Sequence, residues 1–272
     1  MSFDSRKQLS EFLLEDIGKG DITSALLPKK NITAKIISRE KAIVAGVRHA
    51  KEIFKLKGCN VRIIKNDGSK IKPNQTIMII SGNAGMILTC ERTALNLLSR
   101  MSGIATQTNH LVRKISNKKT KLYATRKTAP GLRYFDKEAV EIGGGKKHRL
   151  RLDEMVMIKD NHIATGGSLI ELIKKAKSKY KKYEVEVENT SDAVLAAKEG
   201  ATIIMLDNFL PDQIKKTIQV LKNQKLRSKV MLEASGGINS KNIAKYGSTG
   251  VDIISVGSIT NSVKGIDMSL EI

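Results

Sequence analysis

The 272-residue sequence is short of several residue types, and each shortage excludes a class of protein. It has no Trp, and aromatic residues make up 4% of the chain, so aliphatic side chains have to fill the core. Its two cysteines, Cys59 and Cys90, cannot form a disulfide framework, and neither lies near other metal-ligand residues. No apolar run approaches the roughly 20 residues of a membrane span, and no signal-peptide segment is recognisable. We therefore expect a reduced, cytoplasmic protein.

Positive charge, in contrast, is abundant, with a formal net charge of +21 at pH 7. Such a chain can bind nucleic acid, an anionic membrane surface or small polyanions. Many of the lysines, as in ELIKKAKSKYKK, lie on the polar side of helical patterns and indicate a solvated surface. A nucleic-acid-binding surface would combine basic residues with stacking aromatics, and this chain has few. No membrane partner and no specific nucleic acid are expected.

The first third of the sequence mixes helical and strand patterns, which is typical of an α+β domain. The helical patterns over 6–18 and 47–58 both stop at a glycine. Alternating or apolar segments predict strands over 32–40, 61–65 and 76–82. A long helix over 86–116, interrupted at Ser102 and Gly103, is predicted to leave this region.

From about residue 117 onward, short apolar runs recur and predict a sheet. They are KLYAT (121–125), MVMI (155–158), YEVEV (183–187), TIIML (202–206), KVMLE (229–233) and DIISV (252–256). Most are separated by helical segments, which is the signature of parallel βα units. The runs are fewer than the roughly eight strands of a complete βα barrel. An incomplete barrel of about six strands is predicted, with a doubly wound open sheet as the alternative.

Polar residues follow these runs, at the end where a parallel barrel or sheet builds its active site. Cationic residues come after the early strands, and carboxylates lie in or after the middle strands. Glycine-rich turns with a serine follow the last two strands. In chain order, the candidate site residues are Arg126, Lys127, His148, Arg149, Lys159, Glu186, Asp207, Ser235, Gly236, Gly237, Gly257 and Ser258.

The three groups predict three kinds of contact. Glycine-rich turns at helix N-termini present backbone N–H groups to phosphate oxygens. Glu186 and Asp207 suit Mg²⁺, which binds through one or two carboxylates and ligand oxygens, although either could instead pair with a buried lysine. Arg126 and Arg149 suit a planar carboxylate, which a guanidinium binds through two hydrogen bonds. Group transfer from a phosphosugar to a small polycarboxylate is therefore predicted.

A zinc site is the competing use of the histidines in this region. His148 and His162 are separated by thirteen residues. No cysteine lies between them, and several cations do. Structural and catalytic zinc sites use closely spaced His, Cys or carboxylate ligands. The pattern therefore argues against zinc.

Eight motifs occur in order between residues 86 and 260. They are ERTALNLLSRMSGIAT, TRKTAPGLR, GGGKKHRL, IKDNHI, EVEVEN, IMLDNF, EASGGI and ISVGS. Through them the sequence resembles the quinolinate phosphoribosyltransferase family. The resemblance implies an N-terminal α/β sandwich-like domain with a long connecting helix over 1–105 and an incomplete βα barrel over 106–272. It also implies a homodimer with shared active sites.

The resemblance further implies a reaction in NAD biosynthesis. Quinolinate and phosphoribosyl pyrophosphate would give nicotinate mononucleotide, pyrophosphate and carbon dioxide, the work of a decarboxylating pentosyltransferase. Mg²⁺ would accompany the phosphoribosyl pyrophosphate, and no organic cofactor is implied. Two rival interpretations stay open. One is a relative that uses another acceptor, like the proteins associated with molybdenum transport, although the intact segments KDNH and EVEVEN argue against it. The other is a basic nucleic-acid-binding protein.

Roles for individual residues follow from the same resemblance. The two quinolinate carboxylates would be held by Arg126, His148, Arg149 and Lys159. Arg92, on the long helix, would reach in from the neighbouring subunit. Lys127 would lie between quinolinate and the pyrophosphate, and Glu186 and Asp207 would face the ribose and its magnesium, directly or through water. The 5′-phosphate would be cradled by Ser235, Gly236, Gly237, Gly257 and Ser258.

Overall fold

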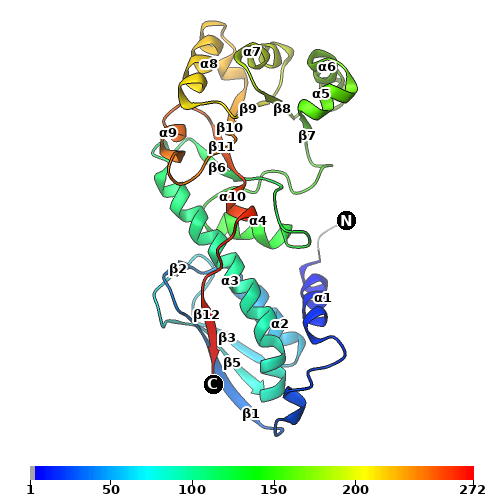
Figure 1. Cartoon of the computed structure of the whole chain (residues 1–272), viewed down its shortest axis with the longest axis vertical. Coiled ribbons are helices and arrows are strands. Elements are labelled where there is room, and N and C mark those ends of the chain that lie inside the picture. The colour runs from blue at the N-terminus through cyan, green and yellow to red at the C-terminus, as the bar shows by residue number, and fades with distance from the viewer. Residues whose placement is uncertain (1–3) are drawn as a thin grey trace. The chain divides into compact units, whose positions relative to one another are not determined.

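The computed structural model describes residues 4–272, which divide into two compact units (Figure 1). The first unit contains the residues up to 107 together with 138–143 and 262–272, and the second contains 108–137 and 144–261. The segment 262–272 belongs to the first unit because its strand β12 (Met268–Glu271) pairs with β1 (Asn31–Ser38). The last strand of the chain thus completes the first sheet.

The first unit is built on a four-stranded antiparallel sheet of order β12-β1-β5-β3. Strand β5 (Thr76–Asn83) pairs with β1 and with β3 (Asn60–Ile63). The further elements of this unit are α1 (Ser5–Ile17), a short 3₁₀ helix (Ser24–Leu26), β2 (Ala42–Ile43), α2 (Val47–Leu56) and β4 (Lys70–Ile71). The predicted helices and strands of this region are confirmed, with small shifts at their ends.

Helix α3 (Ala84–Lys114) runs without a break, so the predicted interruption at Ser102 and Gly103 is wrong. The small residues serve close packing instead. A side chain at Gly103 would place its Cβ 2.2 Å from the carbonyl oxygen of Lys264, so only glycine allows this backbone approach. The Ser102 hydroxyl accepts a hydrogen bond of 3.0 Å from the backbone N–H of Ala45. Both residues therefore lie in close contact with the backbone of other segments of the first unit.

The second unit contains a six-stranded parallel sheet of order β6-β11-β10-β9-β8-β7, as predicted for an incomplete barrel. Its strands are β6 (Lys121–Ala124), β7 (Val156–Ile158), β8 (Tyr183–Val187), β9 (Ile203–Asp207), β10 (Met231–Ser235) and β11 (Ile253–Val256). The edge strands β6 and β7 do not pair with each other among the described residues. The sheet is therefore open between them.

Helices connect these strands along the chain. They are α4 (Arg133–Ile142), α5 (Asp160–Gly166), α6 (Leu169–Lys179), α7 (Thr190–Glu199), α8 (Pro211–Asn223), a 3₁₀ helix (Arg227–Lys229), α9 (Ile243–Gly247) and α10 (Ser258–Asn261). Helix α6 begins with a capping box between Ser168 and Glu171, and α8 begins with proline at its first position. No described helix is long and apolar enough to cross a membrane.

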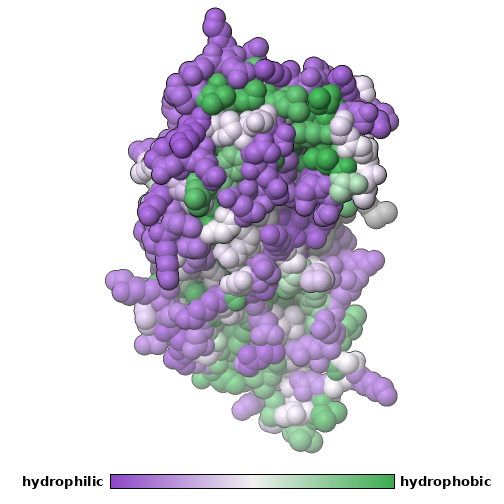
Figure 2. All heavy atoms as spheres, turned by 45° about the horizontal axis from the view of Figure 1, so that its top comes forward, coloured by the Kyte–Doolittle hydropathy of each residue, from purple (hydrophilic) through white to green (hydrophobic). Residues whose placement is uncertain are grey.

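Alternation along the strands of the second unit separates its core from its cavity. Val185, Ile204 and Leu232 are fully buried and form part of the aliphatic core. Glu184 and Glu233 are also fully buried, and each occupies the opposite parity of its strand. Hydrophilic residues cover much of the face in Figure 2, in keeping with the high lysine content. The polar positions inside the sheet therefore need a separate explanation.

Candidate active site

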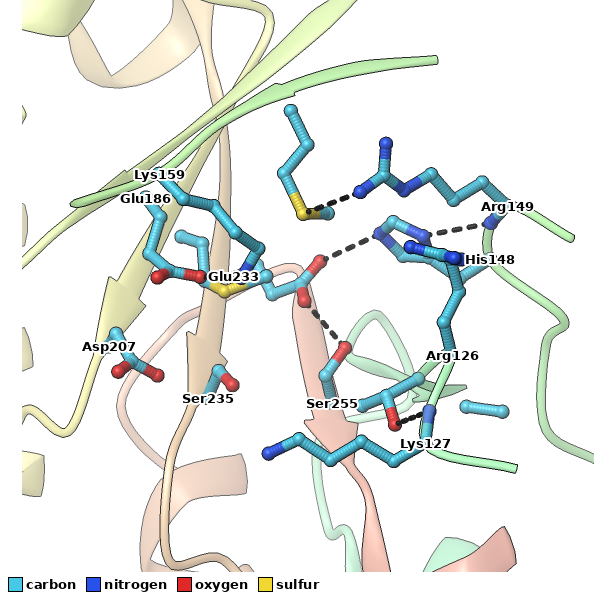
Figure 3. A pocket seen from close by; sticks show the side chains of 14 residues that line it. Arg126, Lys127, His148, Arg149, Lys159, Glu186, Asp207, Glu233, Ser235 and Ser255 are labelled. Carbon is cyan, nitrogen blue, oxygen red and sulfur yellow. Dashed lines mark hydrogen bonds and ion pairs between the residues drawn. The ribbon is translucent and has the colours of Figure 1, made fainter. Parts of the chain in front are cut away.

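A cavity of about 440 Å³ lies at the carboxyl ends of the parallel strands (Figure 3). Eight of the predicted site residues line it: Arg126, Lys127, His148, Arg149, Lys159, Glu186, Asp207 and Ser235. They come from the ends of β6, β8, β9 and β10, from the residue after β7 and from the turn after α4. The parallel sheet thus brings together residues that lie far apart in the sequence.

The cationic residues after β6 lack counter-charges. No ion pair to Arg126 or Lys127 occurs among the described residues, and the buried Nε of Arg126 has no hydrogen-bond partner. The backbone of Lys127 is fixed, because its carbonyl accepts a hydrogen bond of 2.9 Å from the Thr260 hydroxyl. Its side chain packs over Gly257, where an added Cβ would lie 3.1 Å from Lys127 Cδ. These two cations are available to an anionic ligand.

The side chain of Arg149 is held in place by contacts with residues of its own chain segment. One guanidinium nitrogen donates to the carbonyl of Met155 at 2.7 Å, and another lies 3.3 Å from the sulfur of Met157. Burial, followed by the nearby charge of Arg126, lowers the pKa of Arg149 from its ordinary value. Two guanidinium groups at one end of a cavity repel each other unless an anion lies between them.

The carboxylates of the predicted site are both engaged. Glu186 forms an ion pair with Lys159, and Asp207 accepts a hydrogen bond of 2.7 Å from the side-chain amide of Asn208. Asn208 has a left-handed φ of 57° and packs against Gly236, where an added Cβ would lie 2.1 Å from its Oδ1. Gly236 is therefore required to make room for the residue that orients Asp207.

Sequence reasoning missed Glu184, Glu233 and Ser255, which form a cluster with the predicted His148; Glu233 and Ser255 also line the cavity. Nε2 of His148 lies 3.1 Å from a carboxylate oxygen of Glu184 and 3.5 Å from one of Glu233. The Ser255 hydroxyl donates to the other oxygen of Glu233 at 2.5 Å, and the ring of Tyr123 meets that of His148 edge-on at 5.7 Å. The signal was present in YEVEV, where Glu184 and Glu186 share one face of the strand.

The two glutamates determine the proton positions in this cluster. Burial disfavours the His148 cation, but the contacts with Glu184 and Glu233 outweigh it and raise the pKa of His148 to about 9. Burial and then the charge of Glu233 raise the pKa of Glu184, against the effect of His148. The backbone nitrogen of Arg149 lies 2.8 Å from Nδ1 of His148, which fixes the ring with its protonated Nε2 facing the two glutamates.

The ligand atoms of His148, Glu184 and Glu233 lie within 4.8 Å of one another, close enough to hold a metal ion. A metal ligand, however, needs the free lone pair of the imidazole nitrogen that it offers. Here the two glutamates that raise the pKa of His148 to about 9 keep a hydrogen on Nε2, so that nitrogen has no lone pair to offer. The geometry therefore fits a hydrogen-bonded cluster better than a metal centre. His162 is elsewhere, with its Nδ1 accepting the backbone N–H of Lys159 at 3.0 Å.

Four predicted phosphate-binding residues do not line the cavity: Gly236, Gly237, Gly257 and Ser258. The helices after the last two strands, α9 and α10, contain five and four residues. Helices this short add little dipole, so any phosphate binding would depend on backbone N–H groups and side chains. Arg92 is exposed on α3 of the first unit.

A cationic cavity at the carboxyl ends of an incomplete parallel barrel is the site of an enzyme with anionic substrates. Family models of the quinolinate phosphoribosyl transferase N-terminal and C-terminal domains match residues 21–102 and 104–271. The chain belongs to the quinolinate phosphoribosyl transferase family.

Individual relatives agree over nearly the whole chain. The probable nicotinate-nucleotide pyrophosphorylase (carboxylating) of Methanothermobacter thermautotrophicus is 44% identical over 271 residues, which cover 97% of each chain. That of Archaeoglobus fulgidus is 45% identical over 255 residues, 93% of this chain and 98% of the relative. The solved structure of the nicotinate-nucleotide pyrophosphorylase from Francisella tularensis has a TM-score of 0.91 at 41% identity, covering 98% of this chain and 95% of that one.

Proposed function

We propose that the cavity transfers a phosphoribosyl group from phosphoribosyl pyrophosphate to quinolinate, with release of pyrophosphate and carbon dioxide and formation of nicotinate mononucleotide. The observation that carries this proposal is the pair of cations, Arg126 and Lys127, without counter-charges in a cavity that also holds Glu186 and Asp207. Unpaired cations are costly in a confined site unless an anion binds there. Membership of the family, and the names of the relatives above, support the same reaction.

The dicarboxylate acceptor would bind where the cations gather. Arg126, Arg149 and Lys159 would hold its two carboxylates, and guanidinium groups suit this task because they bind carboxylate through paired hydrogen bonds. His148 lies at the same end, but its Nε2 faces the carboxylates of Glu184 and Glu233 and its Nδ1 lies 2.8 Å from the backbone nitrogen of Arg149. We therefore assign His148 to shaping this end of the cavity and supporting Arg149 rather than to donating an N–H to the acceptor.

The phosphosugar would bind on the other side of Lys127. Asp207 and Glu186 offer the oxygen ligands that Mg²⁺ prefers, and both are partly exposed to the cavity, so the residues fit the ion. They would hold it directly or through water, together with the diphosphate oxygens. Bound there, Mg²⁺ would neutralise charge on the leaving pyrophosphate. Ser235, Gly236, Gly237, Gly257 and Ser258 would surround the 5′-phosphate.

The chemistry then depends on charge and alignment. As the bond between the anomeric carbon and pyrophosphate breaks, positive charge develops on the ribose, and the carboxylates of Glu186 and Asp207 stabilise it. Lys127 stabilises the departing pyrophosphate. The acceptor, fixed by its carboxylates, directs its ring nitrogen at the anomeric carbon and forms the new C–N bond. The resulting pyridinium ring stabilises the electron pair of the adjacent carboxylate's C–C bond as carbon dioxide leaves, and that ring carbon then takes up a proton from water.

A homodimer would complete the site. The exposed Arg92 would then reach the acceptor of the neighbouring subunit, as the family resemblance implies. Light scattering of the purified chain, with and without both substrates, would measure the assembly. A monomer that turns over at the full rate would contradict the shared site.

The reaction is tested by incubating the purified protein with quinolinate, phosphoribosyl pyrophosphate and magnesium. A parallel reaction contains nicotinate in place of quinolinate. We expect nicotinate mononucleotide and carbon dioxide in equal amounts from quinolinate, and no product from nicotinate. A folded protein that forms no product from quinolinate would contradict the proposed function and favour a relative with a different acceptor.

A further inference from the structure

Lys137 on α4 is the one lysine that is buried among residues 4–272, and none of its side chain is exposed. Its ammonium has no ion-pair partner in the described chain. The nearest charges are mostly of the same sign, because Arg133, Arg126 and Arg149 outnumber Glu154. A buried cation without a carboxylate is costly, and an apolar side chain of similar length would remove that cost. The retained charge therefore indicates a task.

The contacts of Lys137 identify that task. Its Nζ donates to the backbone carbonyl of Lys147 and to that of Arg149, the latter at 2.7 Å. These two carbonyls lie on either side of His148. Both bonds therefore hold one short stretch of backbone, and they compensate the buried charge where no carboxylate does.

The stretch that Lys137 holds is strained. His148 has φ of 53°, in the left-handed region that side chains other than glycine rarely adopt. Residues 147–149 belong to no helix or strand, so no ladder of backbone hydrogen bonds maintains the turn. A left-handed residue outside regular structure persists where its surroundings over-determine it.

A second cation on the same helix supports the turn. Arg133 lies one helical turn before Lys137, and its Nη1 donates to the carbonyl of Leu150 at 3.2 Å. Its Nε donates to the Thr128 hydroxyl at 3.2 Å, close to the cationic pair after β6. One face of α4 thus binds both chain segments that carry the acceptor-binding residues.

We propose that Lys137 is a positioning residue for acceptor binding: by holding the carbonyls of Lys147 and Arg149, it fixes the left-handed turn at His148 and directs Arg149 into the cavity. This inference rests on the proposed function, because it assumes that Arg149 binds the acceptor. Lys137 does not line the cavity, so it would act on the acceptor only through the turn that it holds. Its effect must therefore appear in the affinity for quinolinate and not in the affinity for phosphoribosyl pyrophosphate.

The variant Lys137→Met tests this role, because methionine keeps the buried apolar stem and removes the donors. Calorimetry of full-length protein would give the Kd for quinolinate, and initial rates would give both KM values. We expect Kd and KM for quinolinate to rise about tenfold or more, because the variant loses one or two hydrogen bonds from a charged donor. KM for phosphoribosyl pyrophosphate should stay within about threefold, since the phosphosugar end is unchanged.

Glu138→Gln is the matched control. Glu138 is the next residue of α4 and is also buried, but it pairs with Arg48 and His49 and does not touch the turn. We expect this variant to unfold at a lower temperature and to bind quinolinate like the wild type. A purely structural role for Lys137 would make the two variants behave alike.

Three results would overturn the inference. Lys137→Met could bind quinolinate like the wild type, it could weaken both substrates equally, or Glu138→Gln could weaken quinolinate as strongly. If Lys137→Met does not fold, Lys137→Gln is the second variant: its neutral amide sits on a stem too short to reach both carbonyls, so a selective but smaller loss of quinolinate affinity is expected from it. A wild type that binds no quinolinate would remove the proposed function itself and this inference with it. Failure of Lys137→Met alone leaves the proposed function intact.

Discussion

Two layers of charge in the second unit behave in opposite ways. The buried network consists of Lys137, His148, Glu184, Glu233 and Ser255, and each member is at least largely buried and bound by other parts of the same unit. The cavity rim consists of Arg126, Lys127, Lys159, Glu186 and Asp207, which are more exposed, and two of its cations have no counter-charge. The charges of the buried network face opposite charges or backbone carbonyls within the protein, whereas two cations of the cavity rim face no counter-charge among the described residues.

The difference separates two uses of charge in one barrel. Charges in the buried network are desolvated, so removing one partner leaves another uncompensated, and the effect falls on stability and geometry. Charges in the cavity rim keep some contact with solvent and gain most when a ligand excludes water. Changes to the rim should therefore reduce turnover with little effect on stability. Changes to the network should reduce the free energy of unfolding or, as at Lys137, displace a residue of the site.

Removal of magnesium should have the largest effect on the rim. An excess of chelator is expected to abolish turnover, because the leaving pyrophosphate then lacks its counter-charge. Product formation would be followed before chelation, after it, and after Mg²⁺ is restored, with recovery expected in the last step. The thermal midpoint of the free protein should not move. Full activity in excess chelator would contradict the metal role.

Lys127→Met should have the next largest effect. Loss of a preorganised cation at the leaving group is expected to lower kcat by about 100- to 1000-fold. The free energy of unfolding should change little, because Lys127 is exposed and unpaired. Lys215→Met is the control, since Lys215 is an exposed lysine that pairs with Asp212 on α8. If both variants kept normal kcat, the rim would not act on the leaving group.

Glu184→Gln probes the buried network. Glutamine keeps the shape and one acceptor but removes the charge that faces His148, and we expect the free energy of unfolding to fall by about 1–3 kcal/mol. Urea denaturation of the variant and the wild type would measure this loss. Glu188→Gln, in the exposed residue after the same strand, should stay within about 0.5 kcal/mol of the wild type. Equal stability of the two variants would contradict the distinction between the layers.

The smallest effect is expected in the pH dependence of stability. Burial, followed by the charge of Arg133, lowers the pKa of Lys137 from 10.5 to about 8. Between these values the unfolded chain binds more protons, so this residue adds to stability as the pH rises from about 8 to 10.5. The difference in unfolding free energy between wild type and Lys137→Met should shift in favour of the wild type as the pH rises through this range. A difference that is constant over this range would contradict the shift.

The sequence predicted the rim well and the buried network poorly, for a physical reason. Rim residues such as Lys159 and Asp207 stand directly after apolar runs, where strand ends are predictable. Glu184 and Glu233 lie inside those runs, and only the pairing of strands brings them to His148. Lys137 lies on a helix and resembles an ordinary surface lysine until the turn at His148 is placed beside it.

The roles of several glycines were also not predictable from the sequence. Ser102 and Gly103 were predicted to break the long helix, because glycine is a poor helix former, but α3 is continuous there. Gly236 and Gly257 were predicted to cradle phosphate, and the structure gives each a local steric reason, beside Asn208 and Lys127. A close approach between distant segments leaves no local pattern, so these reasons could not be found from the sequence.

The pairing of β12 with β1 has a consequence for the order in which the protein matures on the ribosome. The edge strand Met268–Glu271 joins residues 35–38, which are synthesised more than two hundred residues earlier. The first sheet therefore remains one strand short while the whole barrel emerges. Because closing so large a loop is slow, the unfinished edge at β1 stays open to chaperones and to other nascent chains until residues 268–271 have been made and have paired with it.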